Sequence, residues 1–156
     1  MKRTQIISLL ILLFLIVLPA CRENEWADWR LKNEQWLEKL KMDHKNDSTF
    51  HVTSTGLCYK VIDKGYMRQP NEYSYITVNY KGTLIDGHMF DSGSNAKFYL
   101  PENIQGWKEG IPKMKGGGTF IFYIPYKLGY DTISTKNGIP PYSTLIFEVD
   151  LISSEN

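Results

Sequence analysis

The stretch DGHMFDSG, residues 86–93, places two aspartates, a histidine and a serine close together in the sequence. Side chains of these types could bind a metal ion or form a nucleophile with its general base. The three histidines of the chain, however, are not paired at the spacing of zinc ligands, and the two aspartates lack the further oxygen ligands of a calcium loop. Ser92 also has no Gly-x-Ser-x-Gly context. We therefore expect no metal site, no cofactor and no covalent catalysis.

The other candidate groups are equally incomplete. Cys58 stands in the apolar stretch GLCYKVI with no base nearby, which predicts a small buried side chain. The three glycines at 116–118 lack the lysine and the serine or threonine of a phosphate-binding loop. The net charge of +1, without a dense basic run, argues against a nucleic-acid partner. What remains is a concentration of aromatic and aliphatic residues near strand ends and one helix start, the usual composition of a binding pocket.

The elements that must position these residues are mainly β-strands. A hairpin turn is predicted at Asp86-Gly87, and a short helix is predicted over residues 102–111. Because strands occur on both sides of this single helix, the order of elements predicts an α+β fold, in which an antiparallel sheet packs on one short helix. The predicted strands cover residues 57–63, 73–85, 97–100, 116–124 and 143–152.

Residues 24–42 predict another helix, ahead of the strands. Its apolar residues recur at spacings of three and four, which is typical of an amphipathic helix, and Asn33 interrupts the stripe. We expect the stripe to pack on the domain that follows, and a face for self-association or for a partner is the alternative. The polar segment 43–50 predicts a linker. The stripe consists of Trp26, Trp29, Trp36, Leu37 and Leu40.

The beginning of the chain is typical of an export signal. Two basic residues precede an apolar run from Ile6 to Leu18, which is too short to span a membrane because a span takes about 20 residues. The run ends in LPAC, residues 18–21, which resembles the cleavage box of bacterial lipoproteins. Cleavage after Ala20 would make Cys21 the lipid-bearing first residue. An ordinary secretory cut that leaves Cys21 as a free thiol is the alternative.

These features predict three parts of the chain. Residues 1–20 are the expected lipoprotein signal peptide, residues 21–50 the lipidated N-terminus with its helix and linker, and residues 51–156 the folded domain. A lipid on Cys21 would anchor the protein to a membrane in the cell envelope of a Gram-negative bacterium. Because the residue directly after Cys21 is not an aspartate, we expect the outer membrane.

Four motifs follow one another along the chain: VNYKGTLIDGHMFDSG (78–93), IQGWKEGIPKMKGG (104–117), IPYKLGYD (124–131) and GIPPYSTLIFEVDLI (138–152). In this order and spacing, they resemble the FKBP-type peptidyl-prolyl cis-trans isomerases. The resemblance covers about residues 51–153 and implies a bent antiparallel sheet wrapped around one short α-helix, with an apolar pocket for proline-containing polypeptides. It also implies isomerase activity on exported, folding proteins, through stabilisation of a twisted amide without covalent chemistry. A non-catalytic proline-peptide-binding or chaperone module is the alternative.

The same resemblance implies a set of site residues. Asp91 is similar to the carboxylate beside the family's pocket, and Trp107 to the indole at its floor. The backbone N–H of Ile104 is expected to face a bound carbonyl, and the hydroxyl of Tyr130 to donate at the rim. Ala96 stands on the substrate-binding wall where many members carry an aromatic residue. The expected apolar walls are Tyr80, Phe90, Ile139 and Phe147.

Overall fold

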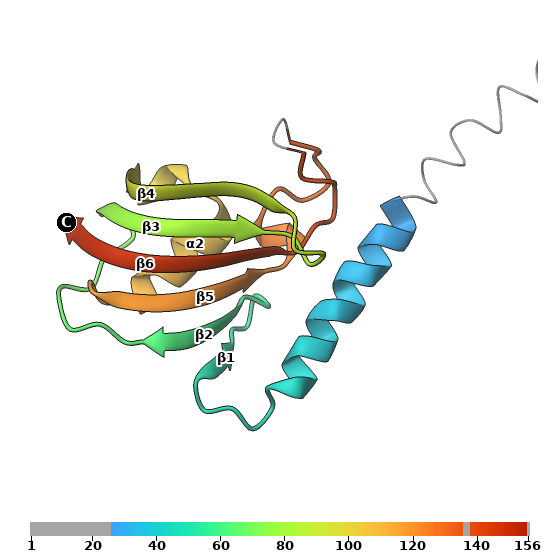
Figure 1. The fold of residues 1–156 in the computed structure, drawn as a ribbon, viewed down its shortest axis with the longest axis horizontal. Helices are drawn as coiled ribbons and strands as arrows, with labels where there is room; N and C mark the ends of the chain where they lie inside the picture. Colours follow the sequence, from blue (N-terminus) through green and yellow to red (C-terminus); the bar gives the residue numbers. More distant parts are fainter. Residues whose placement is uncertain (1–25, 136–137, 156) are drawn as a thin grey trace, which may run out of the picture.

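The computed structural model describes residues 26–135 and 138–155. Its centre is a six-stranded antiparallel sheet in the order β1-β2-β5-β6-β3-β4 (Figure 1). The helix α2 (Gln105–Gly110) lies behind the sheet in this view, and we call the sheet surface that it packs on the α2 face. The predicted α+β class is confirmed. The strands are β1 (Phe50–Val52), β2 (Cys58–Asp63), β3 (Tyr75–Thr83), β4 (Met89–Tyr99), β5 (Gly118–Ile124) and β6 (Leu145–Glu155).

Alternation along β6 shows why this sheet forms. Every second residue from Leu145 to Leu151 is buried, whereas Glu148 and Asp150 are exposed, which is the pattern of a strand with one covered face. The buried residues meet Trp107 and Ile111 from the helical segment in one apolar core. Short 3₁₀ turns flank this segment and hold its ends. They are η1 (Leu100–Glu102) before α2 and η2 (Ile111–Lys113) after it. A third 3₁₀ turn, η3 (Tyr126–Leu128), follows β5.

Two strands differ from the sequence prediction. β4 covers eleven residues, whereas the prediction covered only residues 97–100. The prediction was too short because the earlier part of β4 contains serine, glycine and asparagine, which have weak strand propensity. It pairs with β3 along most of its length, with an irregularity where Asn95 adopts φ +50°. β1 was not predicted at all. It begins at Phe50 inside the expected linker and pairs with β2 through three residues.

The turn between β3 and β4 also differs from the prediction. Leu84 donates its N–H to the carbonyl of His88 at 2.9 Å, and Gly87 donates to the carbonyl of Leu84 at 3.0 Å. Gly87 has φ +87°, so a turn ending in a left-handed glycine replaces the two-residue turn at Asp86-Gly87. The carboxylate of Asp86 accepts the N–H of His88 at 3.0 Å, which makes this aspartate a turn residue.

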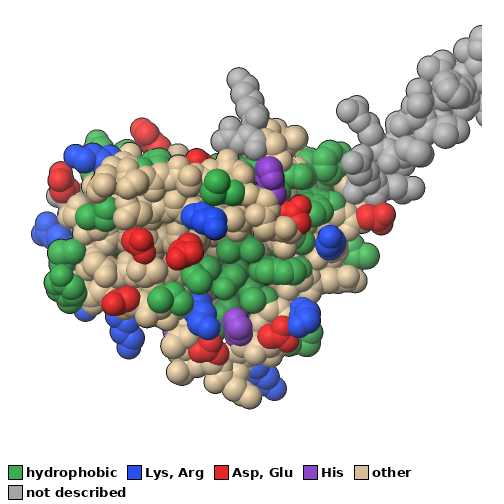
Figure 2. Space-filling view, viewed as in Figure 1, with side chains coloured by type: hydrophobic (Ala, Val, Ile, Leu, Met, Phe, Trp, Pro, Cys, Tyr) green, Lys and Arg blue, Asp and Glu red, His purple; other side chains and the backbone are tan. Residues whose placement is uncertain are grey.

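The N-terminal helix is described from residue 26 to residue 43 and runs along the sheet near the start of β6 (Figure 1). It packs on the sheet surface opposite α2, where Leu37 joins Phe50, Cys58 and Tyr123 in a second apolar cluster. Figure 2 shows hydrophobic side chains gathered in the middle of this side of the molecule. The predicted burial of Cys58 is confirmed, and burial raises the pKa of its thiol to about 11.

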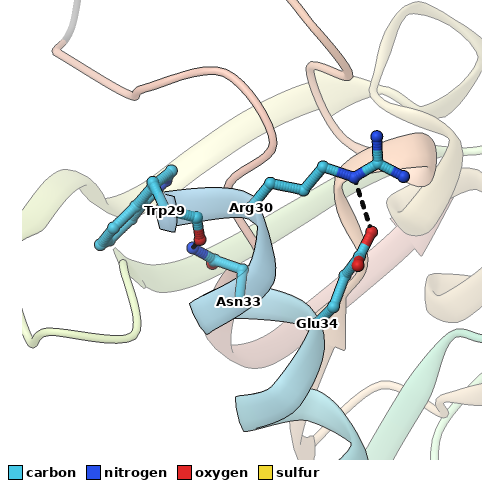
Figure 3. A network of polar contacts seen from close by, with 4 residues as sticks. All are labelled: Trp29, Arg30, Asn33 and Glu34. Atoms are coloured by element: carbon cyan, nitrogen blue, oxygen red, sulfur yellow. Dashed lines mark hydrogen bonds and ion pairs between the residues drawn. The ribbon is translucent and has the colours of Figure 1, made fainter. Parts of the chain in front are cut away.

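Polar contacts fix the same helix to the chain before β6. Asn33, which interrupts the apolar stripe, is fully buried and accepts the N–H of Thr144 at 2.8 Å. Its amide group also donates to the carbonyl of Trp29 at 2.8 Å, and the indole of Trp29 donates to the hydroxyl of Ser143 at 3.0 Å. Figure 3 shows Trp29 and Asn33 on this helix, together with the exposed Arg30–Glu34 ion pair, whose nitrogen and oxygen lie 2.8 Å apart. Asn33 is therefore part of the packed surface.

Within residues 26–135 and 138–155, no helix is both long enough and apolar enough to cross a membrane. The expected signal peptide, its cleavage site and Cys21 lie outside the described residues.

Candidate active site

A cavity of about 220 Å³ lies on the α2 face, where the beginning of α2 meets β3, β4, β6 and the loop after η3. Aromatic rings form most of its wall, and polar groups stand at the rim. Such a cavity suits one small ring rather than a large ligand, because pockets for drug-sized ligands have volumes of about 300–1,000 Å³. Its lining consists of Tyr80, Asp91, Phe98, Glu102, Asn103, Ile104, Trp107, Tyr130 and Phe147.

Four aromatic rings form the apolar part of this cavity. Trp107, only 3% exposed, lies 5.5 Å from Tyr80, 5.4 Å from Phe98 and 5.3 Å from Phe147 between ring centroids. The interplanar angles lie between 79° and 87°, so each ring stands almost perpendicular to the indole. Edge-to-face contacts of this kind are favourable and fix the orientation of each ring. The result is a rigid aromatic box.

Two glycines permit this close arrangement. Gly93 lies opposite Tyr80 in the β3–β4 register, and a Cβ there would approach the tyrosine ring to 2.6 Å. A side chain at this position would therefore displace Tyr80. Gly106 weakens α2 intrinsically, but a Cβ there would lie 2.5 Å from the side chain of Ile124 on β5. The glycine lets α2 approach the sheet and brings Trp107 to the cavity.

Asp91 connects the polar groups at the rim. Its carboxylate accepts the hydroxyl of Tyr80 at 3.0 Å and the backbone N–H of Ser92 at 2.9 Å. Burial, followed by the hydrogen bond to Asp91, raises the pKa of Tyr80 to about 12. Burial and the charge of Asp91 also raise the pKa of Tyr130. Both phenols therefore stay protonated at neutral pH and can act as donors.

Two N–H groups at the cavity have no acceptor within the described part of the chain. Ile104 precedes α2 with an extended backbone, and no hydrogen bond involves its N–H. Backbone donors at a helix start are unsatisfied unless another group caps them. The buried Nε1 of Trp107 also has no partner there. A bound carbonyl oxygen would satisfy a donor of this kind.

The structure brings six of the nine predicted pocket residues to the cavity lining. Of the other three, Phe90 packs behind the wall, 5.4 Å from Phe147 and nearly perpendicular to it. Ile139 is buried in the main core and does not reach the cavity. Ala96 pairs with Val78 and shares its sheet face, but it is not among the lining residues. The six are Tyr80, Asp91, Ile104, Trp107, Tyr130 and Phe147.

Three lining residues were not among the residues predicted from the sequence. Phe98 lies two positions after Ala96 on the same face of β4, and its ring forms an aromatic wall of the cavity. The apolar–polar alternation of KFYL would have placed Phe98 on the covered face. Glu102 and Asn103 come from η1 and the residue after it. No periodic signal in the sequence shows that this short turn borders the cavity.

The described side chains form no cluster of three or more histidine, cysteine, aspartate or glutamate residues that could hold a metal ion. The polar groups at the cavity are instead hydrogen-bond donors and the carboxylates of Asp91 and Glu102, of which that of Asp91 is fixed by hydrogen bonds. This arrangement can bind and orient an apolar ring with flanking carbonyl groups.

The free energy of unfolding is expected to fall above about pH 10. The ordinary pKa of a tyrosine is 10.0, and that of Tyr80 is raised to about 12 in the folded chain. Its contribution to stability is complete below pH 10 and is lost as the pH rises through 12, since the unfolded state releases its proton first. Urea unfolding at pH 8, 9 and 11.5 measures this loss. The loss of stability should be smaller in Tyr80→Phe. Equal urea midpoints of the wild type at pH 9 and pH 11.5 would contradict a raised pKa of Tyr80.

Comparisons with known proteins identify similar chains. The family model described as FKBP-type peptidyl-prolyl cis-trans isomerase matches residues 66–152. FkpA of Escherichia coli K12, an FKBP-type peptidyl-prolyl cis-trans isomerase, is 38% identical over 134 residues, which are 83% of this chain and 48% of that protein. The outer membrane protein MIP of Legionella longbeachae is 42% identical over 140 residues, or 87% of this chain and 60% of that protein. The chain thus spans about half the length of these curated relatives.

The fold has a similar counterpart among solved structures. The crystal structure of FkpA from Escherichia coli has a TM-score of 0.81 to this chain at 32% sequence identity. The match covers 99% of this chain and 74% of that one. The similarity of fold and sequence therefore extends over the sheet, α2 and the cavity between them.

Proposed function

The chain belongs to the FKBP-type peptidyl-prolyl cis-trans isomerases, and we propose that its aromatic cavity catalyses rotation about X–Pro peptide bonds. The observation that carries this proposal is the aromatic box of about 220 Å³ with unpaired N–H groups beside it. Its apolar surface suits a proline ring, and its donors suit the carbonyl groups on either side of that ring.

The proposed mechanism is non-covalent. Rotation about a peptide bond has a barrier of about 18–20 kcal/mol because twisting removes amide resonance. The planar amide has the larger charge separation, so transfer from water to an apolar cavity disfavours the planar form more than the twisted form. Groups that hold the flanking backbone in place while the bond rotates add to this preference. No side chain has to act as a nucleophile or a base.

Each lining group has a proposed role. The rings of Trp107 and Phe147 hold the proline ring, and the N–H of Ile104 donates to the carbonyl of the bound proline. Tyr130 is 39% exposed at the rim, and its hydroxyl donates to the peptide backbone on the other side. Asp91 fixes the hydroxyl of Tyr80 and keeps the rim negative.

We further propose that the activity assists the folding of exported proteins. Uncatalysed X–Pro isomerisation takes tens to hundreds of seconds and can limit folding. The rate constant of a proline-limited refolding phase should rise in proportion to the concentration of the chain from residue 22 to 156. A slow phase that does not respond to micromolar concentrations of this chain would exclude the role.

A lipid anchor on Cys21 in the outer membrane is the proposed location. The LPAC box supports it, and one similar protein is named an outer membrane protein. In cells of a Gram-negative host, labelled palmitate should be incorporated into the wild-type chain and not into Cys21→Ser. Equal labelling of the two chains would contradict the anchor.

A further inference from the structure

Negative charge is concentrated at the mouth of the cavity. Asp91 and Glu102 line it, and none of its described lining residues is a lysine or an arginine. The carboxylate of Asp91 is already engaged by Tyr80 and Ser92. Across the described residues, by contrast, no hydrogen bond or ion pair involves the carboxylate of Glu102, which is exposed. Glu102 therefore offers an unpaired charge to whatever occupies the cavity.

The backbone that carries Glu102 is held firmly in place. Glu102 ends the 3₁₀ turn η1, which has Pro101 near its start. Asn103 closes this turn, because its N–H donates to the carbonyl of Leu100 at 3.1 Å. The side-chain amide of Asn103 also donates to the carbonyl of Tyr99 at 2.8 Å. The position of Glu102 is thus tied to that of Ile104, two residues later in the chain.

We propose that Glu102 selects substrates with a lysine or an arginine directly after the proline. This inference rests on the proposed function, in which the N–H of Ile104 binds the carbonyl of the bound proline. The next residue of the substrate is attached to that carbonyl, so its side chain lies within reach of Glu102. A cationic side chain there is attracted to the unpaired carboxylate, and an acidic one is repelled.

The effect has the size of an exposed ion pair. Exposed pairs contribute about 0.2–1 kcal/mol because water and salt screen the charges. When a substrate with lysine after the proline is compared with one that has glutamate there, the attraction of the lysine and the repulsion of the glutamate add together. We therefore expect a preference for lysine over glutamate of about fivefold in kcat/KM at low salt. At 1 M NaCl the Debye length is only about 3 Å, and the preference should largely disappear.

The test uses unstructured peptides that differ only in the residue after proline, which is lysine, glutamine or glutamate. Exchange NMR gives kcat/KM for cis–trans conversion with the chain of residues 22–156. The Lys/Glu ratio of kcat/KM should fall about fivefold in Glu102→Gln, and the glutamine peptide serves as the uncharged reference substrate for both chains. Glu72→Gln is the matched control, because Glu72 is exposed and not among the cavity residues. It should leave the ratio unchanged.

Each contrary result has a distinct meaning. A Lys/Glu ratio that stays the same in Glu102→Gln, or that falls equally in Glu72→Gln, would overturn the proposed selectivity. A second peptide set carries the charged residue before the proline. If Glu102→Gln changes the Lys/Glu ratio only in this second set, Glu102 acts on the residue before the proline, and the proposed position after the proline is wrong. Failure to accelerate even the glutamine peptide would overturn the proposed isomerase function itself, and this inference with it.

Discussion

Replacing Asp91 with alanine is expected to lower kcat/KM for an X–Pro peptide by about 100-fold, the lower end of the effects seen when one positioned polar group is removed from a reacting centre. The substitution leaves the hydroxyl of Tyr80 without its acceptor at 3.0 Å. Burial and the charge of Asp91 raise the pKa of Tyr130, and the substitution removes that charge. Asp91 itself is exposed, so the folded state should persist. Peptide isomerisation rates at pH 7 measure the loss of activity. Circular dichroism spectra of the wild type and Asp91→Ala test whether the variant is folded.

Asp86→Ala is the matched control for this experiment. Asp86 lies in the same stretch, five positions earlier, but its carboxylate accepts the N–H of His88 in the hairpin turn. It is not among the residues that line the cavity. The control should keep kcat/KM within about twofold of the wild-type value, because surface substitutions usually have small effects. Equal losses in both variants would show that the hairpin, and not the carboxylate of Asp91, controls the rate.

Replacing Asn33 with alanine is expected to lower the free energy of unfolding by about 2–3 kcal/mol. The buried N–H of Thr144 would lose its acceptor at 2.8 Å, and the carbonyl of Trp29 would lose a donor. A buried donor without a partner costs more than the hydrogen bond itself contributes, because water cannot replace the lost acceptor. Urea unfolding of the chain from residue 22 to 156 measures the difference.

Gln35→Ala is the control in the same helix, because Gln35 is exposed and two positions from Asn33. Alanine has the higher helix propensity, so this variant should be about as stable as the wild type. If Asn33→Ala were as stable as Gln35→Ala, the helix would not depend on its polar contact with the chain before β6. The apolar contacts of Leu37 with Phe50 and Tyr123 would then be sufficient to hold it.

The sequence predicted the parts of the fold that depend on periodicity. The long apolar alternation of β6 and the stripe of the N-terminal helix each extend over several residues, so single polar residues do not hide them. β1 was missed because it has only three residues in a polar segment and depends on pairing with β2. The length of β4 was missed for a related reason: its pairing with β3 outweighs the weak strand propensity of its first half.

The candidate site was predictable where family motifs carry its residues, as at Tyr80, Asp91 and Trp107. Phe98 and Glu102 were missed because their places in the lining depend on the face of β4 and on a 3₁₀ turn. Asn33 shows the same limit outside the site. In the sequence, this asparagine only interrupts a helical stripe. Its role depends on the N–H of Thr144, which donates to it from a distant part of the chain.

Cis–trans exchange of a proline tetrapeptide tests the central claim most directly, because it requires only the cavity and one X–Pro bond. With the chain from residue 22 to 156 at micromolar concentration, we expect exchange faster than the uncatalysed rate, in proportion to the amount of protein. Asp91→Ala at the same concentration should lose most of this acceleration. An exchange rate equal to the uncatalysed rate, with wild-type protein shown to be folded, would contradict the account.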